Sequence, residues 1–411
     1  MRWTFGQCPT PVELLGTQTK EFHMAGALVS TNVLSTLCAM GLATLRERLA
    51  LVFVANREYE RLISGATRFA TVNVAVPAAV ASRVVAPDVV PPSVTAVTPT
   101  NVAVTLSQWY EAPFAMDDKG LVQVDNGIIP MQAKEAVKAI ANTIEDYLWS
   151  LLAAKVSGYA GTAGATPFQQ GLDDFLAADK ILNDNLADPE DRFMIINTAA
   201  KASAMGLRAI QDASFRGNKS NSLISGEIGD VLGARWLMSQ RVPNHTAGTL
   251  AGVGTTVTGV NAIGATVIAL SGGASGTLIA GDVIDFGILD AYGNLQTYNV
   301  VSSVGSGTPS SVTIASPGLL VATAGTEIVA KRASFAQNIL IQKNCLAFAM
   351  APLLDTIEVP GATLQSVAID EVSGLSLRLE VSRQHRQAQW SFDALYGGTV
   401  VRPQLASWLA G

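Results

Sequence analysis

The residue types that could carry out chemistry do not form a catalytic pattern in this sequence. A phosphate-binding loop needs a glycine-rich run followed by Lys and Ser or Thr, but no lysine follows the run at residues 161–164. A nucleophile elbow needs Gly-x-Ser-x-Gly, but Thr277 stands where the second glycine after Ser275 should be. The cysteines are odd in number and far apart: Cys8, Cys38 and Cys345. Such spacing argues against a disulfide framework and a zinc site, and it favours a reducing compartment.

The histidines and the neighbouring acids favour structural roles. The histidines are isolated from one another in sequence: His23, His245 and His385. The acids that could suggest a carboxylate pair or a hard-cation site are Asp117/Asp118, Glu145/Asp146, Asp173/Asp174 and Asp282/Asp285. Adjacent acids on a helix point to different sides, and acids three apart on a strand lie on opposite faces. We therefore expect surface or capping roles. The sequence predicts no enzyme and no catalytic, cofactor-binding or metal-binding residues.

Four helices are expected to position the rest of the chain. Pro130 should open a long helix that ends near Ser157, because proline in the first turn and glycine after the last are typical boundaries. Its apolar face carries Val137, Ile140, Ile144, Leu148 and Leu151, and the charged Lys134, Lys138, Glu145 and Asp146 lie off it. At 1.5 Å per residue this helix would span about 40 Å. The other helices are a charged-faced one over 44–62, an amphipathic one with Leu172, Phe175, Leu176, Leu182 and Leu186, and one capped by Asn197 that runs to Ile210.

Alternating side chains predict a long two-stranded arm. Valines alternate with smaller or polar residues over 69–76 and again over 102–109, which is the period of a β-strand. Five prolines lie between the two strands: Pro77, Pro87, Pro91, Pro92 and Pro99. A two-stranded ribbon is not stable alone in water, and its edges invite pairing with another chain. We therefore expect the arm to lie on another subunit.

After His245 the sequence changes to Gly, Ser, Thr, Val and Ala, with short strands and frequent turns. Strands are expected at 265–270, 282–286, 296–301 and 311–314, with a turn at 290–294. This pattern predicts an all-β module of about 85 residues, a small barrel or sandwich, inserted into a mixed domain. Two long antiparallel strands are expected near the C-terminus, over 375–382 and 389–394.

Charge is scarce, and its absence is concentrated in two blocks. Only 15% of the 411 residues are charged, compared with about 25% in typical domains. Residues 69–110 carry only Arg83 and Asp88, and residues 246–330 carry only Asp282, Asp285, Asp290 and Glu327. Interface cores are depleted of charge, so the scarcity predicts that the arm is buried against other subunits. For the β module it does not decide between burial and a surface that faces water. The net charge of −6 disfavours sequence-specific or backbone binding to DNA.

An uncharged stretch over 26–45 is about long enough to span a bilayer. It is polar for a spanning helix, and no basic residue directly precedes it, so we expect a helix that packs on a neighbour rather than a membrane or secretion segment. Met24 could be the initiator, which would make residues 1–23 an artefact, and the sequence leaves this open.

Three stretches, in order, resemble a known family. The run Ser391-Phe-Asp-Ala-Leu-Tyr-Gly-Gly-Thr-Val-Val-Arg-Pro403 is similar to the C-terminal strand of tailed-phage major capsid (coat) proteins. Residues 338–352 resemble that family's return from an inserted domain, and residues 228–243 resemble the strand and turn before it. The resemblance covers roughly residues 24–411 and points to the Hong Kong 97 (HK-97) type fold, in the branch with an inserted β domain as in coat proteins of short-tailed Salmonella phages.

The resemblance implies an α+β fold with an N-arm, an extended hairpin loop, a long spine helix, and peripheral and axial domains. The implied boundaries are 1–62 for the N-terminal extension and arm, 63–128 for the extended loop, 129–194 for the peripheral domain with its spine helix at 131–157, 195–245 for the axial domain, 246–332 for the inserted all-β (Ig-like or barrel) domain, 333–365 for the axial return, and 366–411 for the C-terminal peripheral strands. Some relatives crosslink their shell through a Lys–Asn isopeptide. Since residues 69–110 contain no lysine, we predict no such crosslink.

The function implied is that of a structural shell protein. The chain would self-assemble into hexamers and pentamers and form an icosahedral virion capsid around double-stranded DNA. Its partners would be further copies of itself, a scaffolding protein and a portal, with no membrane and no cofactor, and assembly would take place in the host cytoplasm. Candidate intersubunit contacts are the rare charges Arg57, Arg61, Arg83, Asp117 and Asp118. Two alternatives stay open: an encapsulin-like nanocompartment shell, and a surface-binding, adhesin-like β protein.

Overall fold

The computed structural model describes residues 34–46, 49–57, 71–76, 82, 100–119, 128–211, 228–250, 254–272, 275–290, 292–305, 307–353, 364–370 and 374–411. The chain divides into two compact units. The first unit takes in residues 1–48, 108–141 and 350–395, and the second takes in 49–107, 142–349 and 396–411. Helix α5 (Ile128–Lys155) and strand β19 (Gln387–Val400) contribute residues to both units. The fold is α+β, as predicted.

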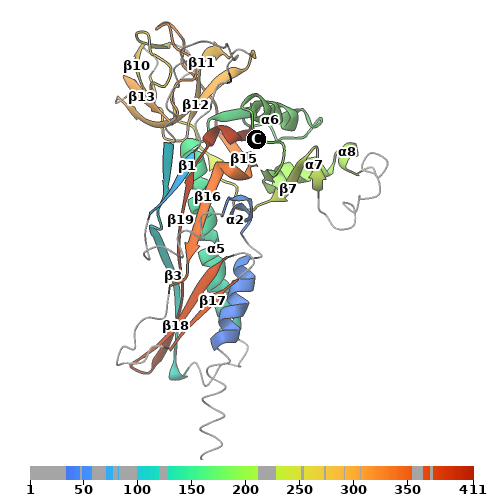
Figure 1. The fold of residues 1–411 in the computed structure, drawn as a ribbon, viewed down its shortest axis with the longest axis vertical. Helices are drawn as coiled ribbons and strands as arrows, with labels where there is room; N and C mark the ends of the chain where they lie inside the picture. Colours follow the sequence, from blue (N-terminus) through green and yellow to red (C-terminus); the bar gives the residue numbers. More distant parts are fainter. Residues whose placement is uncertain are drawn as a thin grey trace, which may run out of the picture. The chain divides into compact units, whose positions relative to one another are not determined.

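The first unit packs helices on one face of a β-sheet. Strand β18 (Ser376–Gln384) lies between β17 (Leu364–Ile369) and β19, and β3 (Gln108–Asp117) pairs with β19. A helix over residues 34–46 lies beside β17, where the Cys38 thiol donates to the Ser366 carbonyl (Figure 1). A side chain on Gly41 would lie 3.0 Å from Leu377 and 3.1 Å from Val137, so this helix, β18 and α5 are closely packed there.

The predicted C-terminal hairpin is confirmed. Strands β18 and β19 pair antiparallel over seven registered positions, from Arg378 opposite Asp393 to Gln384 opposite Gln387. Leu377, Leu379 and Phe392 are buried. His385 lies in the exposed turn between the strands, as expected. Because alternate residues of a strand face opposite sides, the apolar positions face the helices and the polar ones face away.

The second unit is built on a seven-stranded mixed sheet. Its strands are β4 (Gly158–Gly161), β5 (Arg192–Ile196), β6 (Gly229–Val231), β7 (Ala234–Met238), β8 (Asn244–His245), β15 (Phe335–Gln342) and β20 (Ala406–Ala410). The order is β4-β20-β15-β5-β7-β6, with β8 paired to β15. Every residue of β15 is buried, as expected for a central strand. After β15, a 3-10 turn (Lys343–Cys345) leads into β16 (Leu346–Ala351), and a second one (Pro403–Leu405) precedes β20.

Two predicted helices of this unit needed correction. Helix α6 (Asp173–Asp184) forms, but Leu176 is half exposed and Leu186 is 90% exposed. Leu186 falls after the helix end, in a left-handed conformation with φ 56°, so the helical period no longer applies to it. Asn197 caps α7 (Thr198–Met205) as predicted, since its side chain accepts from the Ala200 amide at 2.7 Å. That helix stops before Gly206, and α8 (Arg208–Gln211) is separate.

The helix predicted over 44–62 is wrong for residues 55–57. The helix over 34–46 and the short α2 (Leu51–Val54) are separate, and residues 58–62 lie outside the described part. Asn56 instead pairs with β16: its amide donates to the Leu346 carbonyl at 2.7 Å, and its carbonyl accepts from the Phe348 amide at 3.1 Å. A strand partner supplied by the tertiary fold therefore replaces the helical hydrogen bonds that the local pattern favours.

The arm begins as predicted but its second strand is shorter. Strand β1 (Val72–Val76) pairs antiparallel with β2 (Thr100–Val104), with Val74 opposite Val102. The alternation over 102–109 does not make one strand, because residues 105–107 leave the ladder and β3 starts at Gln108. The five tip prolines lie outside the described residues.

The residues from 254 to 331 form a separate sheet within the second unit. Its strands are β9 (Thr255–Val257), β10 (Val267–Gly272), β11 (Val283–Leu289), β12 (Leu295–Val304), β13 (Ser311–Ile314) and β14 (Ala330–Lys331). They are ordered β14-β11-β12-β13-β10-β9 and enclose their own apolar core around Ile284, Phe286 and Val300 (Figure 1). The predicted turn is present, since Asp290 accepts from the Asn294 amide at 2.8 Å. The name β module is kept below for these six strands.

Candidate functional site

No catalytic arrangement is found among the described residues. No group of three His, Cys, Asp or Glu side chains there could hold a metal ion. Burial raises the pKa of the Cys38 thiol to about 11, and burial also raises the pKa of Cys345, so both thiols stay protonated. Among the described helices, none is both long and apolar enough to cross a membrane. The features that could matter to function are therefore the places where the arm and the β module join the rest of the second unit.

The base of the arm rests on a pair of glycines in β19. A side chain on Gly397 would lie 2.8 Å from the Thr105 carbonyl carbon and 3.0 Å from the Leu106 Cα, and closer still to the Thr105 oxygen. Only glycine admits so close an approach of two backbones. Next to it, the Tyr147 hydroxyl of α5 donates to the Gly398 carbonyl at 3.2 Å. The Gly-Gly pair of the C-terminal signature therefore brings the arm, β19 and α5 together.

The segment over residues 49–57, just before the arm, lies on the same helix. The Glu145 carboxylate accepts from the Leu51 amide at 2.9 Å. Glu145 is 2% exposed, so the prediction that it lies off the apolar face of the helix is wrong. Its neighbour Asp146 is about half exposed and holds the guanidinium of Arg241, with Nε donating at 3.0 Å. The two adjacent acids do point to different sides, as predicted.

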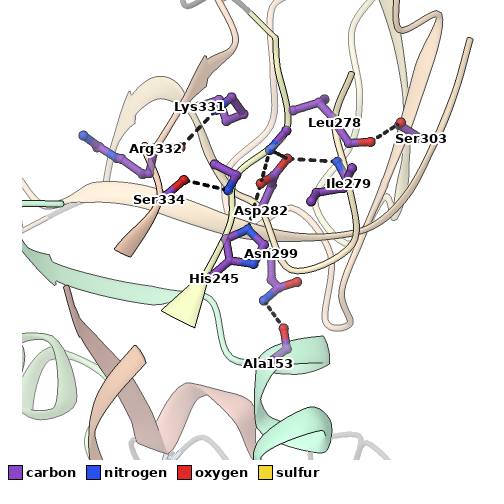
Figure 2. Close-up of polar contacts among 12 residues, drawn as sticks. Ala153, His245, Leu278, Ile279, Asp282, Asn299, Ser303, Lys331, Arg332 and Ser334 are labelled. Atoms are coloured by element: carbon purple, nitrogen blue, oxygen red, sulfur yellow. Dashed lines mark hydrogen bonds and ion pairs between the residues drawn. The ribbon is translucent and has the colours of Figure 1, made fainter. Parts of the chain in front are cut away.

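The C-terminal end of α5 is joined to the β module. The last carbonyls of a helix have no partner inside it. Asn299 of β12 is 1% exposed, and its side-chain nitrogen donates to the Ala153 carbonyl at 2.7 Å (Figure 2). The same nitrogen donates to the Val156 carbonyl at 2.9 Å. The Thr297 hydroxyl donates to the Ser157 carbonyl at 2.6 Å. The β module therefore serves as the C-terminal cap of α5.

A buried acid holds the chain where it enters the module. Asp282 is fully buried, and one of its oxygens lies 2.8 Å from Nε2 of His245. It also accepts from the amides of Gly248 at 3.1 Å and Ile279 at 2.9 Å (Figure 2). A buried carboxylate with this many donors is satisfied, which indicates a structural role rather than a catalytic one.

A second buried acid holds the chain where it leaves the module. Asp285 of β11 pairs with Arg332 at 2.9 Å, directly after β14. The Arg332 guanidinium also lies 5.4 Å from the centre of the Tyr159 ring of β4. Such a stacked guanidinium is attracted to the ring face. Entry and exit of the module are thus each fixed by one aspartate.

Three of the five predicted contact residues lie in the part of the chain that the structure describes. Arg57 lies over the Phe348 ring at 5.7 Å. Asp117 is exposed at the end of β3, and Asp118 pairs with Arg383 at 2.9 Å. Arg61 and Arg83 lie outside the described residues, as do Cys8 and His23.

Sequence reasoning missed the His245–Asp282 pair because the two residues lie far apart in the chain. One available signal was the scarcity of charge in the module. Asp282 and Asp285 are two of only four charged residues over 246–330, and both are buried. Where almost no charge is present on a surface, an isolated aspartate is a candidate for a buried, hydrogen-bonded role.

Three comparisons with known proteins complete this description. No protein-family model matches the sequence, and no curated protein matches it. Among solved structures, the chain is similar to one described as Mycobacterium phage Che8, with 15% identity, coverage of 88% of this chain and 90% of that chain, and a TM-score of 0.48. The capsid of Cyanophage P-SCSP1u matches with 10% identity, 82% coverage of each chain and a TM-score of 0.45.

A virus-like particle from Pyrococcus furiosus is also similar, with 8% identity, coverage of 92% of this chain and 98% of that chain, and a TM-score of 0.40. Each of these TM-scores lies below 0.5.

Proposed function

We propose that this chain is the major capsid protein of a tailed bacteriophage and self-assembles into the icosahedral head shell around double-stranded DNA. The observation that carries the proposal is the arm. Strands β1 and β2 form a two-stranded ribbon, and its base is fixed to β19 at Gly397. One face of the ribbon is buried within the chain through Val74 and Val104, whereas its other face, with Asn73, Asn101 and Ala103, is exposed and open to another chain.

A second copy of this chain is the partner that the arm fits best. An arm on one copy that meets a different surface on the next copy makes a heterologous contact. Heterologous contacts repeat around a closed ring, which is how hexamers and pentamers form. The scarcity of charge between residues 69 and 110 supports a buried interface.

The resemblance of the three sequence stretches supports the finer assignment. In it, α5 is the spine helix of a peripheral domain, residues 195–245 and 333–365 form an axial domain, and residues 246–332 form the inserted β domain. The separate core of the β module supports the last of these. A scaffolding protein and a portal belong to the same proposal, as do virion localisation and intersubunit roles for Arg57, Arg61, Arg83, Asp117 and Asp118. The net charge of −6 suits a shell that encloses DNA without binding it tightly.

Electron microscopy of the full-length chain, alone and with the other head proteins, tests the proposal. Val76 and Thr100 are register partners, so an Asn-Gly turn can replace residues 77–99 and close a short hairpin. We expect shells from the wild-type chain and only small oligomers from the shortened one, with unchanged amide protection in β5 and β15. A wild-type chain that stays monomeric with scaffolding protein present, or a shortened chain that still forms shells, would contradict the proposal. Shells that contain an enzyme and no nucleic acid would favour a nanocompartment instead.

A further inference from the structure

The buried carboxyl group of Glu145 has an unusual setting. One of its oxygens accepts from the Leu51 amide at the start of α2. The other oxygen is buried and has no hydrogen-bond partner among the described residues. The indole nitrogen of Trp149, one helical turn further along α5, is also buried without a partner. An ionised carboxylate in such a place is poorly solvated, whereas a neutral carboxylic acid is tolerated.

The charged groups around Glu145 do not neutralise it. On its own helix the nearest charge is Asp146, which repels a second negative charge. Arg241, in the turn after β7, attracts a negative charge on Glu145, but its guanidinium already pairs with Asp146. From the segment over 49–57 come only the backbone amides of Leu51 and Ala50, because Arg57 at its far end lies over Phe348. Burial is therefore the dominant influence on this carboxyl group.

The segment over 49–57 has two anchors of different chemistry. Its start is held by Glu145, a group that can gain or lose a proton. Its end is held by Asn56, which bonds to the backbone of β16 and, through its side chain, to Asn344 at 2.9 Å. The second anchor contains only neutral groups, so pH can act on the first anchor alone.

We propose that Glu145 is a proton-controlled latch that holds the start of the 49–57 segment on α5 when protonated and releases it when ionised. Burial raises the pKa of Glu145 to about 7, which supports this reading. The sign follows from linkage: the docked form binds the proton more tightly than the released form, so docking is strongest below pH 4.5, weakens as pH rises from 4.5 to about 7, and stays weak above that.

The latch lies at the start of the segment that precedes the arm in the chain. The chain passes from the first unit to the second between residues 48 and 49, directly before the latched residues. After Arg57 the chain continues toward β1 and the arm. Releasing the start of the segment would therefore free Leu51 from α5 while Asn56 stays bound to β16. The latch does not depend on assembly, so its failure and that of the shell proposal can be told apart.

Hydrogen–deuterium exchange of the full-length chain tests the latch. Protection factors of the amides over 50–54, corrected for intrinsic rates, are compared from about pH 5 to about pH 8.5. Linkage predicts about a tenfold loss of protection per pH unit between the ordinary pKa of 4.5 and the raised pKa of about 7, and no further loss above it. We expect this loss in the wild type and a flat, high protection in Glu145→Gln, since the amide oxygen can still accept from Leu51. The matched control is Glu135→Gln, the same change at an exposed position of α5, which should behave as the wild type.

Two outcomes would overturn the latch: a flat profile in the wild type, or a Glu145→Gln variant that keeps the wild-type slope. If Glu145→Gln fails to fold, the partly exposed Arg241→Gln serves instead. Removing that cation should move the midpoint of the profile to higher pH, because the repulsion from Asp146 is then unopposed. An unchanged midpoint in Arg241→Gln would equally contradict the proposal.

Discussion

Replacing Gly397 with alanine should displace the base of the arm. The new Cβ would lie 2.8 Å from the Thr105 carbonyl carbon and 3.0 Å from the Leu106 Cα, with the Thr105 oxygen nearer than either. These are backbone atoms, which cannot rotate away, so the strand itself must move by about an ångström to restore ordinary contact. Overpacking of this kind costs about 1–3 kcal/mol. Leu106 is 7% exposed, and partial loss of its burial adds about 1–2 kcal/mol.

The matched control is Gly398→Ala, one residue further along. Its Cβ would lie 3.1 Å from the Ala347 oxygen, a tight contact that small shifts can relieve. In a strand, alanine in place of glycine also reduces the entropy lost on folding, by about 0.5–1 kcal/mol. We therefore expect a net loss of about 1–4 kcal/mol for Gly397→Ala, and a change near zero for Gly398→Ala.

Hydrogen–deuterium exchange of the peptides covering β2 and residues 105–107 measures the effect locally, which matters because a chain of this size does not unfold in one step. Amide protection there should fall by about tenfold or more in Gly397→Ala, while β5 is unaffected. The reasoning is refuted if Gly397→Ala protects residues 100–107 as well as the wild type, or if the two alanine variants lose protection equally.

Three further predictions concern the module junction, the thiols and the shell. Asn299→Leu removes both hydrogen bonds to the end of α5 and should cost about 2–4 kcal/mol, seen as reduced protection of β12 and residues 153–157; unchanged protection would show that Thr297 alone suffices. Cys38 and Cys345 should resist iodoacetamide at about pH 8 in the folded chain, because burial raises both thiol pKa values, and mapping of the label after digestion would reveal any labelling that contradicts this. Boiled denaturing gels of mature particles should show single chains, since residues 69–110 contain no lysine, and a ladder of covalent oligomers would contradict the absence of a crosslink.

The helices and strands with a clear period of apolar residues could be predicted from the sequence. The long helix has proline and glycine at its ends and an apolar face, and α5 covers Ile128–Lys155. The alternation in the C-terminal strands and the Gly-rich texture after His245 were equally informative, because both patterns come from local side-chain placement. The Asp290 turn and the Asn197 cap were predictable because these side chains bond to their own backbone.

The errors arose where a distant strand or helix decides the local structure. Residues 55–57 leave the predicted helix because β16 supplies backbone partners for Asn56. Strand β2 ends at Val104, and the residues that follow lie against Gly397, which is almost three hundred positions away in sequence. Glu145 is buried because Leu51 presents an amide to it. Periodicity within one segment contains no information about such partners.

The scarcity of charge now has two different explanations. In the β module, two of the few charged residues are spent on intramolecular contacts: Asp282 binds His245 and two amides, and Asp285 binds Arg332. The module has its own core and is joined to α5 through Asn299, so it needs no second subunit to account for its composition. In the arm, one face of the two-stranded ribbon is buried within the chain through Val74 and Val104, and the opposite face, with Asn73, Asn101 and Ala103, is exposed. The deficit of charge in the module therefore needs no intersubunit interface, whereas in the arm it agrees with the interface that we propose for the exposed face of the ribbon.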